Sequence, residues 1–255
     1  MIRIKVPLKN ILPAVALALW GAQGAAAYDR SVLAEYNDMY KNGNYQSALD
    51  GYLDMISKEP ANPYAFYNAG NAYFRMNKPG QAILYYSKAW RLDPRNPDIR
   101  ANLEFALKHT GQAFVPDGVP RVLHYLYYCL SDEELKAAAS AAWWALFLLF
   151  SFYFLKPGIA SGTRTPLFTA GGLFALSLLW FMARSASPFR DGAVITDKGA
   201  AQLMSGPGDN FKAYASLPEA RLVKILDDTD DIYYEIAIPK EGIKGWVKKT
   251  SAEKI

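Results

Sequence analysis

Residues able to do chemistry are few in this sequence and are scattered along it. Its two histidines, His109 and His124, have no acid or cysteine pattern around them, and Cys129 is the single cysteine. One cysteine can form neither an intrachain disulfide nor a cysteine-based metal cluster. The sequence also has no glycine-rich phosphate loop and no Gly-x-Ser-x-Gly elbow. We therefore expect no catalytic residue, no metal, no cofactor and no enzyme activity.

The charge balance gives no support for a nucleic-acid partner. Three of the 28 Lys and Arg residues lie within residues 1–27, which leaves 25 basic against 24 acidic residues in the rest of the chain. Nucleic-acid binding relies on an excess of positive charge. We therefore expect no nucleic-acid partner.

Residues 1–27 have the layout of a secretory signal peptide. A short basic region is followed by an apolar run, and small residues, Ala25 and Ala27, precede Tyr28. This arrangement is typical of a cleavage site. Cleaved or retained as an anchor, the segment would place the residues that follow it outside the cytoplasm.

Two later runs, 137–155 and 166–183, are far more apolar than the rest of the chain. Each has about the length that a membrane-spanning helix needs, and the short polar segment 156–165 between them would be a cytoplasmic loop. A buried hairpin of a soluble domain is the alternative, but it would show a stripe of charged residues. These runs predict an inner-membrane protein whose other parts lie on the periplasmic side.

The segment before the first run, 113–136, is aromatic and weakly amphipathic. Its tyrosines suit either an interfacial helix beside a membrane or ordinary packing beneath the preceding domain. Ser131 and Glu134 have the spacing of a capping box, which predicts a helix start at this point.

Internal repetition is clear between residues 29 and 96. A shift of about 34 residues superimposes Ala48 on Ala82, Tyr52 on Tyr86 and, at the end of each unit, Pro60 on Pro94. The small residues would let antiparallel helices approach closely, and the aromatic residues would fill the space beside them. A related helix start at Pro97 follows the second unit.

This pattern resembles the tetratricopeptide repeat family. The resemblance implies an all-α solenoid over 28–112, with repeats at 29–62 and 63–96 and a capping helix at 97–109. First helices of such repeats line a groove that binds protein partners. By position, the partner-binding groove residues are Asn37, Tyr40, Lys41, Tyr64, Tyr67, Asn71, Phe74 and Arg75.

Some members of the family hold a peptide carboxylate with two asparagines and three basic residues. Asn37 and Asn68 match the two asparagines of this clamp. Leu33, Asp98 and Asn102 stand where the cations should be, so we expect the clamp to be absent.

From residue 192 onward, short strand-like runs alternate with turn sequences, which predicts a small all-β barrel of about five strands. The Gly206-Pro207 turn and the run 245–247, Gly-Trp-Val, resemble bacterial SH3 domains. This resemblance implies a binding surface of Tyr233, Tyr234 and Trp246. The alternative for Trp246 is a place in the core of the barrel.

The complete order of segments is that of a multidomain membrane protein: a tetratricopeptide solenoid, a transmembrane helical hairpin and an SH3-like barrel. It resembles one component of the Bat aerotolerance group. That resemblance implies an envelope scaffold whose partners include von Willebrand A-domain membrane proteins and an AAA+ ATPase. The alternative is a cell-wall sensor that binds peptidoglycan through the barrel.

Overall fold

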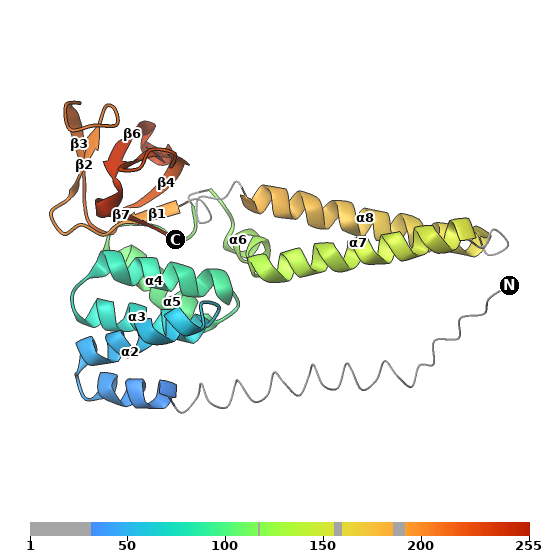
Figure 1. Cartoon of the computed structure of the whole chain (residues 1–255), viewed down its shortest axis with the longest axis horizontal. Coiled ribbons are helices and arrows are strands. Elements are labelled where there is room, and N and C mark those ends of the chain that lie inside the picture. The colour runs from blue at the N-terminus through green and yellow to red at the C-terminus, as the bar shows by residue number, and fades with distance from the viewer. Residues whose placement is uncertain (1–31, 117, 156–159, 186–191) are drawn as a thin grey trace.

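The chain folds into a stack of helices, a long helical hairpin and a β-sheet domain (Figure 1). The computed structural model describes residues 32–116, 118–155, 160–185 and 192–255. The predicted signal peptide, 1–27, lies outside these ranges.

Helices at the N-terminal end of the described chain form antiparallel pairs. A helix over 32–41 precedes α2 (Tyr45–Lys58), α3 (Pro63–Arg75), α4 (Pro79–Leu92) and α5 (Pro97–His109). A proline opens each of the last three helices, where its missing N–H costs nothing because the first helical N–H groups have no partner in the helix.

Two equivalent asparagines begin successive repeats. The Asn62 side chain accepts hydrogen bonds from the backbone N–H groups of Tyr64 and Ala65, at 3.1 and 3.3 Å. Asn96 accepts from Asp98 and Ile99 in the same way, at 3.0 and 3.3 Å. These N-caps satisfy amides that have no partner within the helix, and they fix where α3 and α5 start.

Small residues allow the helices to pack closely. Ala48, Ala69, Ala82 and Ala89 are fully buried, as their repeat positions predict. Gly70 lies against the ring of Tyr86, so closely that an added Cβ would come within 2.6 Å of a ring carbon. Glycine is therefore required at this crossing of α3 and α4.

Beyond α5, the chain packs back onto the helical stack. The short helix α6 (Arg121–Tyr127) brings His124 and the following Tyr128 against Trp90 of α4, with both side chains buried. Of the two possibilities for the segment 113–136, packing beneath the repeat helices is the one that holds for these two residues.

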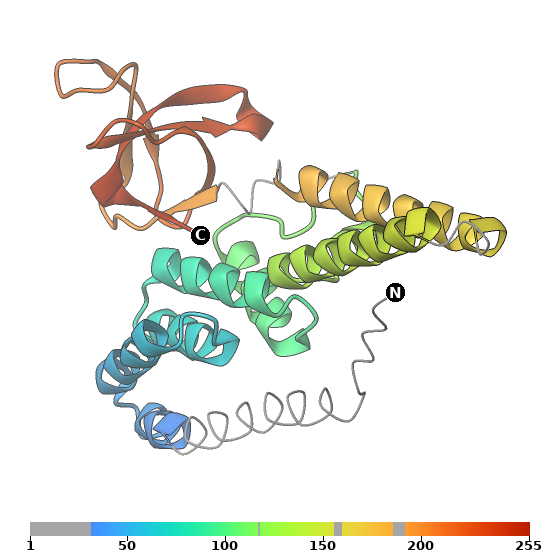
Figure 2. The ribbon, with the colours of Figure 1, turned by 45° about the vertical axis from the view of Figure 1, so that its right-hand side comes forward.

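Helices α7 (Asp132–Leu155) and α8 (Ala160–Ser185) form a hairpin that projects from the rest of the molecule (Figure 2). The predicted capping box at its start is confirmed. Ser131 N–H donates to Glu134 Oε2 at 2.9 Å, and Glu134 N–H donates to Ser131 Oγ at 3.2 Å.

Over the described residues, no helix is both long enough and apolar enough to cross a membrane. This finding contradicts the predicted membrane spans at 137–155 and 166–183. The membrane-protein fold class and the inner-membrane localisation, which depend on those spans, are therefore wrong as predicted.

The C-terminal domain is a seven-stranded antiparallel sheet with two short 3₁₀ turns, where about five strands were predicted. The strands run in the order β3-β2-β6-β5-β4-β1-β7. They are β1 (Gly192–Ile195), β2 (Ala201–Met204), β3 (Ala213–Leu217), β4 (Leu222–Asp227), β5 (Tyr233–Ile238), β6 (Ile243–Lys248) and β7 (Ala252–Lys254). Its core includes Ile195, Leu203, Ile236 and Val247.

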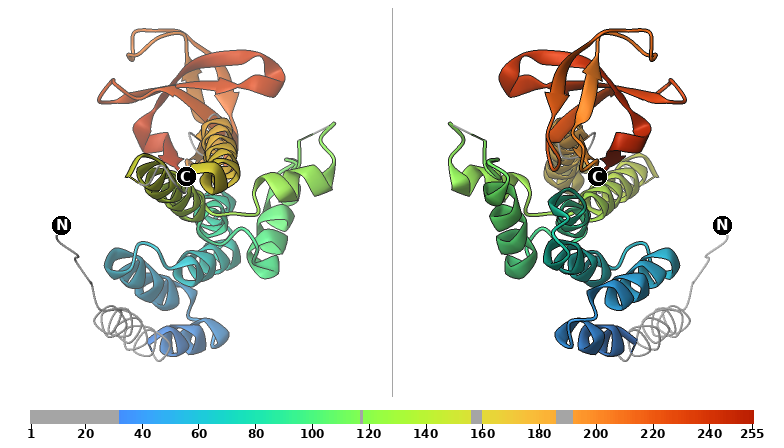
Figure 3. Two further views of the ribbon diagram at one scale, coloured as in Figure 1. Left: turned by 90° about the vertical axis from the view of Figure 1, so that its right-hand side faces the viewer. Right: turned by 90° about the vertical axis from the view of Figure 1, so that its left-hand side faces the viewer.

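The β-sheet domain is docked on the helical stack. In both end-on views the sheet domain lies above the repeat helices (Figure 3). Gln112 donates to Ala220 O at 2.8 Å and accepts from Leu222 N–H at 2.9 Å. Gly80, at the start of α4, donates its N–H to Glu219 Oε1 at 3.1 Å. An added Cβ on Gly80 would come within 2.7 Å of Ile195 O, so the two parts meet at backbone distance.

Candidate functional site

A row of asparagine side chains joins the first helices of the repeats. Asn68 on α3 donates to Asn37 Oδ1 at 3.1 Å, and Asn71 one turn later donates to Asn68 Oδ1 at 3.5 Å. Asn102 on α5 donates to Asn71 Oδ1 at 2.9 Å. The row therefore crosses helix 32–41, α3 and α5, and its amides are only partly buried.

Tyrosines support this row from the second helix of each repeat. Tyr52 O–H donates to Asn37 Oδ1 at 2.8 Å, and Tyr86 O–H donates to Asn71 Oδ1 at 2.7 Å. Burial raises the pKa of Tyr52 to about 12 and also raises the pKa of Tyr86. Both hydroxyls therefore stay protonated at neutral pH and remain donors to the asparagines.

A positive charge lies at one end of the row. The Arg75 guanidinium carbon is 4.7 Å from the ring centroid of Tyr45 and 6.0 Å from that of Tyr40. Burial raises the pKa of Tyr40, and the nearby Arg75 partly offsets this effect. Within the described residues Arg75 has no carboxylate partner, so its charge is available to a ligand.

Aromatic side chains lie at the other end. The ring centroid of Phe74 is 5.7 Å from that of Phe105 and 5.9 Å from that of His109, both in edge-on contacts. Phe105 is 60 % exposed, which is unusual for a phenylalanine. We call the surface of helix 32–41, α3 and α5 the first-helix face, and it consists of Asn37, Tyr40, Tyr67, Asn68, Asn71, Phe74, Arg75, Asn102, Phe105 and His109.

Most of the predicted groove residues lie on this face. Tyr67 accepts a hydrogen bond from Asn102 at 3.0 Å. Lys41 and Tyr64 take no part in the row. The ammonium of Lys41 pairs with Asp38 at 2.9 Å, and Tyr64 is 53 % exposed at the start of α3.

Four members of the face, Asn68, Asn102, Phe105 and His109, are not among the predicted groove residues. The sequence predicts Asn68 only as a match to a clamp asparagine and Asn102 only as the residue at a clamp cation position, and it assigns no ligand role to His109. Phe105 is absent from the prediction. The shift of about 34 residues that relates Asn37 to Asn71 leads next to Phe105, so the repeat period itself contained the signal.

The predicted SH3-like surface does not form as one patch. Tyr233 pairs across the sheet with Lys248 and Tyr234 with Val247, so the two tyrosines point to opposite faces. Tyr233 is buried and donates to Asp209 Oδ1 at 2.8 Å. Trp246 lies opposite Glu235, on the Tyr233 side and away from the core face.

The described residues contain no group of three or more His, Cys, Asp or Glu side chains that could hold a metal ion. The first-helix face offers amides, aromatic rings and the Arg75 guanidinium, which lies beside the rings of Tyr40 and Tyr45.

Comparison of the sequence with known protein families agrees with the pairing of α3 and α4. The model of the tetratricopeptide repeat family matches residues 63–96, which covers α3 and α4. The chain therefore contains a tetratricopeptide repeat. Such repeats are protein-interaction modules.

Two curated relatives match part of the chain. Human tetratricopeptide repeat protein 6 is 40 % identical over 60 residues, which are 24 % of this chain and 12 % of that protein. The heat shock protein sti1 homolog of Schizosaccharomyces pombe is 33 % identical over 58 residues, 23 % of this chain and 10 % of that protein. The matches thus span only about a tenth of each relative.

Among solved structures, the type III secretion translocator chaperone SycD of Yersinia enterocolitica is similar over 59 % of this chain and 83 % of that chain. The TM-score is 0.31 and the sequence identity 16 %, a likeness too low to support any assignment.

Proposed function

We propose that this protein is an interaction scaffold that binds an extended peptide segment of a protein partner on the first-helix face. The observation that carries the proposal is the asparagine row, which crosses three helices with hydrogen-bonding capacity to spare. Asn37 Nδ2 donates no hydrogen bond to any described residue. An extended peptide presents backbone groups that need such amide partners.

The two ends of the row define which peptide fits. The uncompensated charge of Arg75 favours an acidic side chain, because a guanidinium pairs with a carboxylate through two hydrogen bonds. The exposed ring of Phe105 favours an apolar or aromatic side chain at the other end. The proposed ligand is therefore an extended segment with an acidic residue toward Arg75 and an apolar residue toward Phe105.

A matched pair of arginines tests this proposal. Arg75 and Arg100 both lie 4.7 Å from a tyrosine ring centroid, but the ring beside Arg100 is Tyr125, outside the first-helix face. Partner recovery with the full chain should fall when Arg75→Ala or Phe105→Ser is introduced. It should remain unchanged with Arg100→Ala. Equal recovery from all three folded variants would refute binding at this face.

At a finer level, we propose that the partners belong to a Bat-type complex with von Willebrand A-domain proteins and an AAA+ ATPase. This proposal is supported only by the resemblance in domain order, and the membrane hairpin that was part of that order is contradicted. Co-purification of those proteins with the tagged full chain tests it, and purification with unrelated partners alone would reject it.

The alternative function, peptidoglycan binding by the C-terminal domain, is not favoured by any observation. Its proposed surface is split between the two faces of the sheet. The likeness of that domain to bacterial SH3 domains stays a prediction, and the proposed scaffold role includes no catalytic step.

A further inference from the structure

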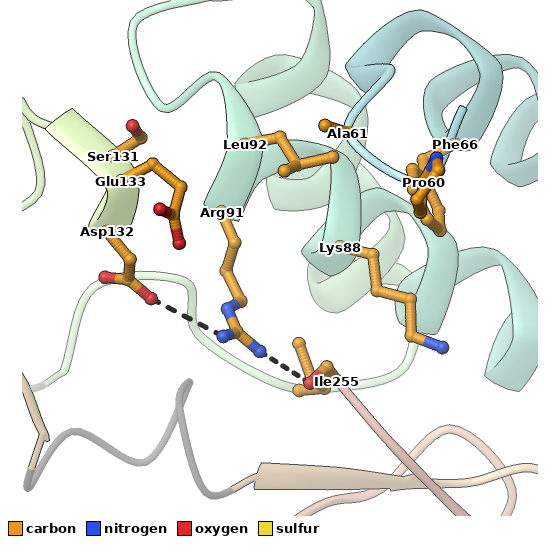
Figure 4. A pocket seen from close by; sticks show the side chains of 10 residues that line it. All are labelled: Pro60, Ala61, Phe66, Lys88, Arg91, Leu92, Ser131, Asp132, Glu133 and Ile255. Carbon is orange, nitrogen blue, oxygen red and sulfur yellow. Dashed lines mark hydrogen bonds and ion pairs between the residues drawn. The ribbon is translucent and has the colours of Figure 1, made fainter. Parts of the chain in front are cut away.

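A cavity of about 420 Å³ lies where the helical stack, the start of α7 and the last residue of the sheet domain meet (Figure 4). Its volume is within the range of ligand pockets. Pro60, Phe66, Leu92 and Ile255 supply apolar walls, and charged side chains reach it from α4 and from the first turn of α7. None of its lining residues belongs to the first-helix face.

Three of the four charged residues in this cavity are paired. Arg91 donates to Ile255 O at 2.6 Å and lies 3.4 Å from Asp132 Oδ2. Glu133 pairs with Lys136 at 2.6 Å. The remaining charged residue of the cavity lining is Lys88, and Figure 4 shows its ammonium beside the cavity.

Lys88 is half-buried and has no carboxylate at ion-pair distance among the described residues. Among the residues that the structure describes, its ammonium contacts the ring of Tyr85, whose centroid is 5.5 Å from Nζ. Burial lowers the pKa of Lys88, Arg91 lowers it further, and Glu253 offsets the shift only in part. A cation that is desolvated without a partner favours the approach of an anion.

We infer that this cavity is a second peptide-binding site, which takes an acidic side chain on Lys88 and a neighbouring apolar side chain between Phe66, Leu92 and Ile255. A carboxylate would compensate the charge of Lys88, and the apolar side chain would be removed from water by walls that are already formed. The inference does not rest on the function proposed for the first-helix face.

Occupancy of this site would also have a structural consequence. Its walls come from α3, α4, the first turn of α7 and Ile255. A bound peptide would contact all of them, so it would hold the sheet domain and the hairpin against the repeat helices. The site therefore couples partner binding to the relative placement of the three parts.

The test uses the full chain and a probe peptide, fluorescein-Gly-Leu-Glu-Leu-Gly-amide, with binding followed by fluorescence anisotropy. A second peptide replaces Glu with Gln. We expect the acidic peptide to bind about tenfold or more tightly than its neutral counterpart, because hydrogen bonds to charged groups are stronger than neutral ones. Lys88→Met, which keeps the length of the side chain, should abolish this preference.

Lys78→Met is the matched control. Lys78 also lies near a ring, with Nζ 5.8 Å from the Tyr73 centroid, but it does not line the cavity, so the preference should persist. The inference is overturned if the acidic peptide shows no saturable binding, if both peptides bind equally, or if Lys88→Met retains the preference. If Arg75→Ala loses binding while Lys88→Met binds as the wild type does, the peptide lies on the first-helix face. That result would also overturn the inference.

Discussion

At the scale of single residues, the asparagine row serves both packing and recognition. Each buried tyrosine hydroxyl of the second helices finds its acceptor in an asparagine of a first helix. The same asparagines remain partly exposed, so they can meet a ligand without leaving a buried group unsatisfied. The repeat thus uses one set of side chains for stability and for binding.

Substitution of Asn71 tests the structural half of this description. Asn71→Ala removes the acceptor of both Tyr86 O–H and Asn102 Nδ2. Because Tyr86 is buried, we expect the free energy that protects α3 and α4 from amide hydrogen exchange to fall by about 1–3 kcal/mol. Gln46→Ala is the control, since within the described part of the chain the Gln46 side chain bonds to exposed Asp50 and not to the row. An equal loss in both variants would contradict the role of the row.

Residue types and period predicted much at this scale, including the buried alanines and the capping box of Ser131 and Glu134. The proposed SH3-like surface failed because Tyr233 and Tyr234 are adjacent in one strand and must point to opposite faces. Phe105 was missed because the repeat pattern lapses in α5, although its position is repeat-equivalent to Asn71.

At the scale of helices and strands, close approach between elements decides where glycine is required. Gly70 lies on α3 against Tyr86 of α4, whereas Gly172 lies on α8 with nothing within 4 Å of an added Cβ. An alanine at Gly172 would change only the helix propensity, whereas an alanine at Gly70 would also clash with a side chain. Comparing the two positions therefore separates the steric cost from the effect of helix propensity.

Alanine at the two positions should have opposite effects. Gly172→Ala should stabilise α8 by up to about 1 kcal/mol, because alanine loses less backbone entropy. Gly70→Ala gains the same propensity but forces Tyr86 to move, at a cost of about 1–3 kcal/mol. Local amide exchange measures both, and a Gly70→Ala protein with α3 more protected than wild type would contradict the packing.

The start of α7 should depend on pH through Glu134. The backbone N–H of Ser131, and then Arg95, hold the pKa of this carboxyl below its usual range. A depressed native pKa gives stability that is complete above the unfolded pKa, about 4.3, and is lost as pH falls through the native value. Protection of the first turn should therefore be constant from neutral pH to about pH 5 and fall below that.

Glu134→Gln should remove most of this dependence and lower protection at neutral pH. Glu133→Gln is the control. It removes the same charge from the same turn, but the Glu133 carboxylate accepts a hydrogen bond from Lys136 and takes no part in the capping box. A wild-type profile that remains flat into strong acid would refute the assignment.

At the scale of the whole molecule, the sheet domain is held on the helical stack by contacts between residues far apart in sequence. These contacts involve the side chains of Gln112 and Glu219 and the main chain of Gly80. No pattern in the sequence indicates them, since periodicity describes elements and not how separate domains meet. The repeat period of about 34 residues did predict the positions of α3, α4 and α5. The apolar runs 137–155 and 166–183 did coincide with helices α7 and α8. Treating those runs as membrane spans was the step that failed.

Gly80→Ala tests the docking directly. The added Cβ would meet the backbone oxygen Ile195 O at 2.7 Å, which cannot move aside as a flexible side chain could. We expect faster amide exchange in β1 and at the start of β4, with the core strands β5 and β6 unchanged. Unchanged exchange in β1 would show that the two parts do not meet at this distance.

Site-specific crosslinking tests whether a partner peptide lies on the first-helix face. A photoreactive phenylalanine analogue would replace Phe105 in the full chain, and, as a control, Phe211 of the sheet domain, which is 42 % exposed. We expect Phe105, and not Phe211, to crosslink to one extended partner segment that contains an acidic residue, and we expect Arg75→Ala to abolish the crosslink. Crosslinks of equal yield and identity from both positions, or a Phe105 crosslink unaffected by Arg75→Ala, would contradict it.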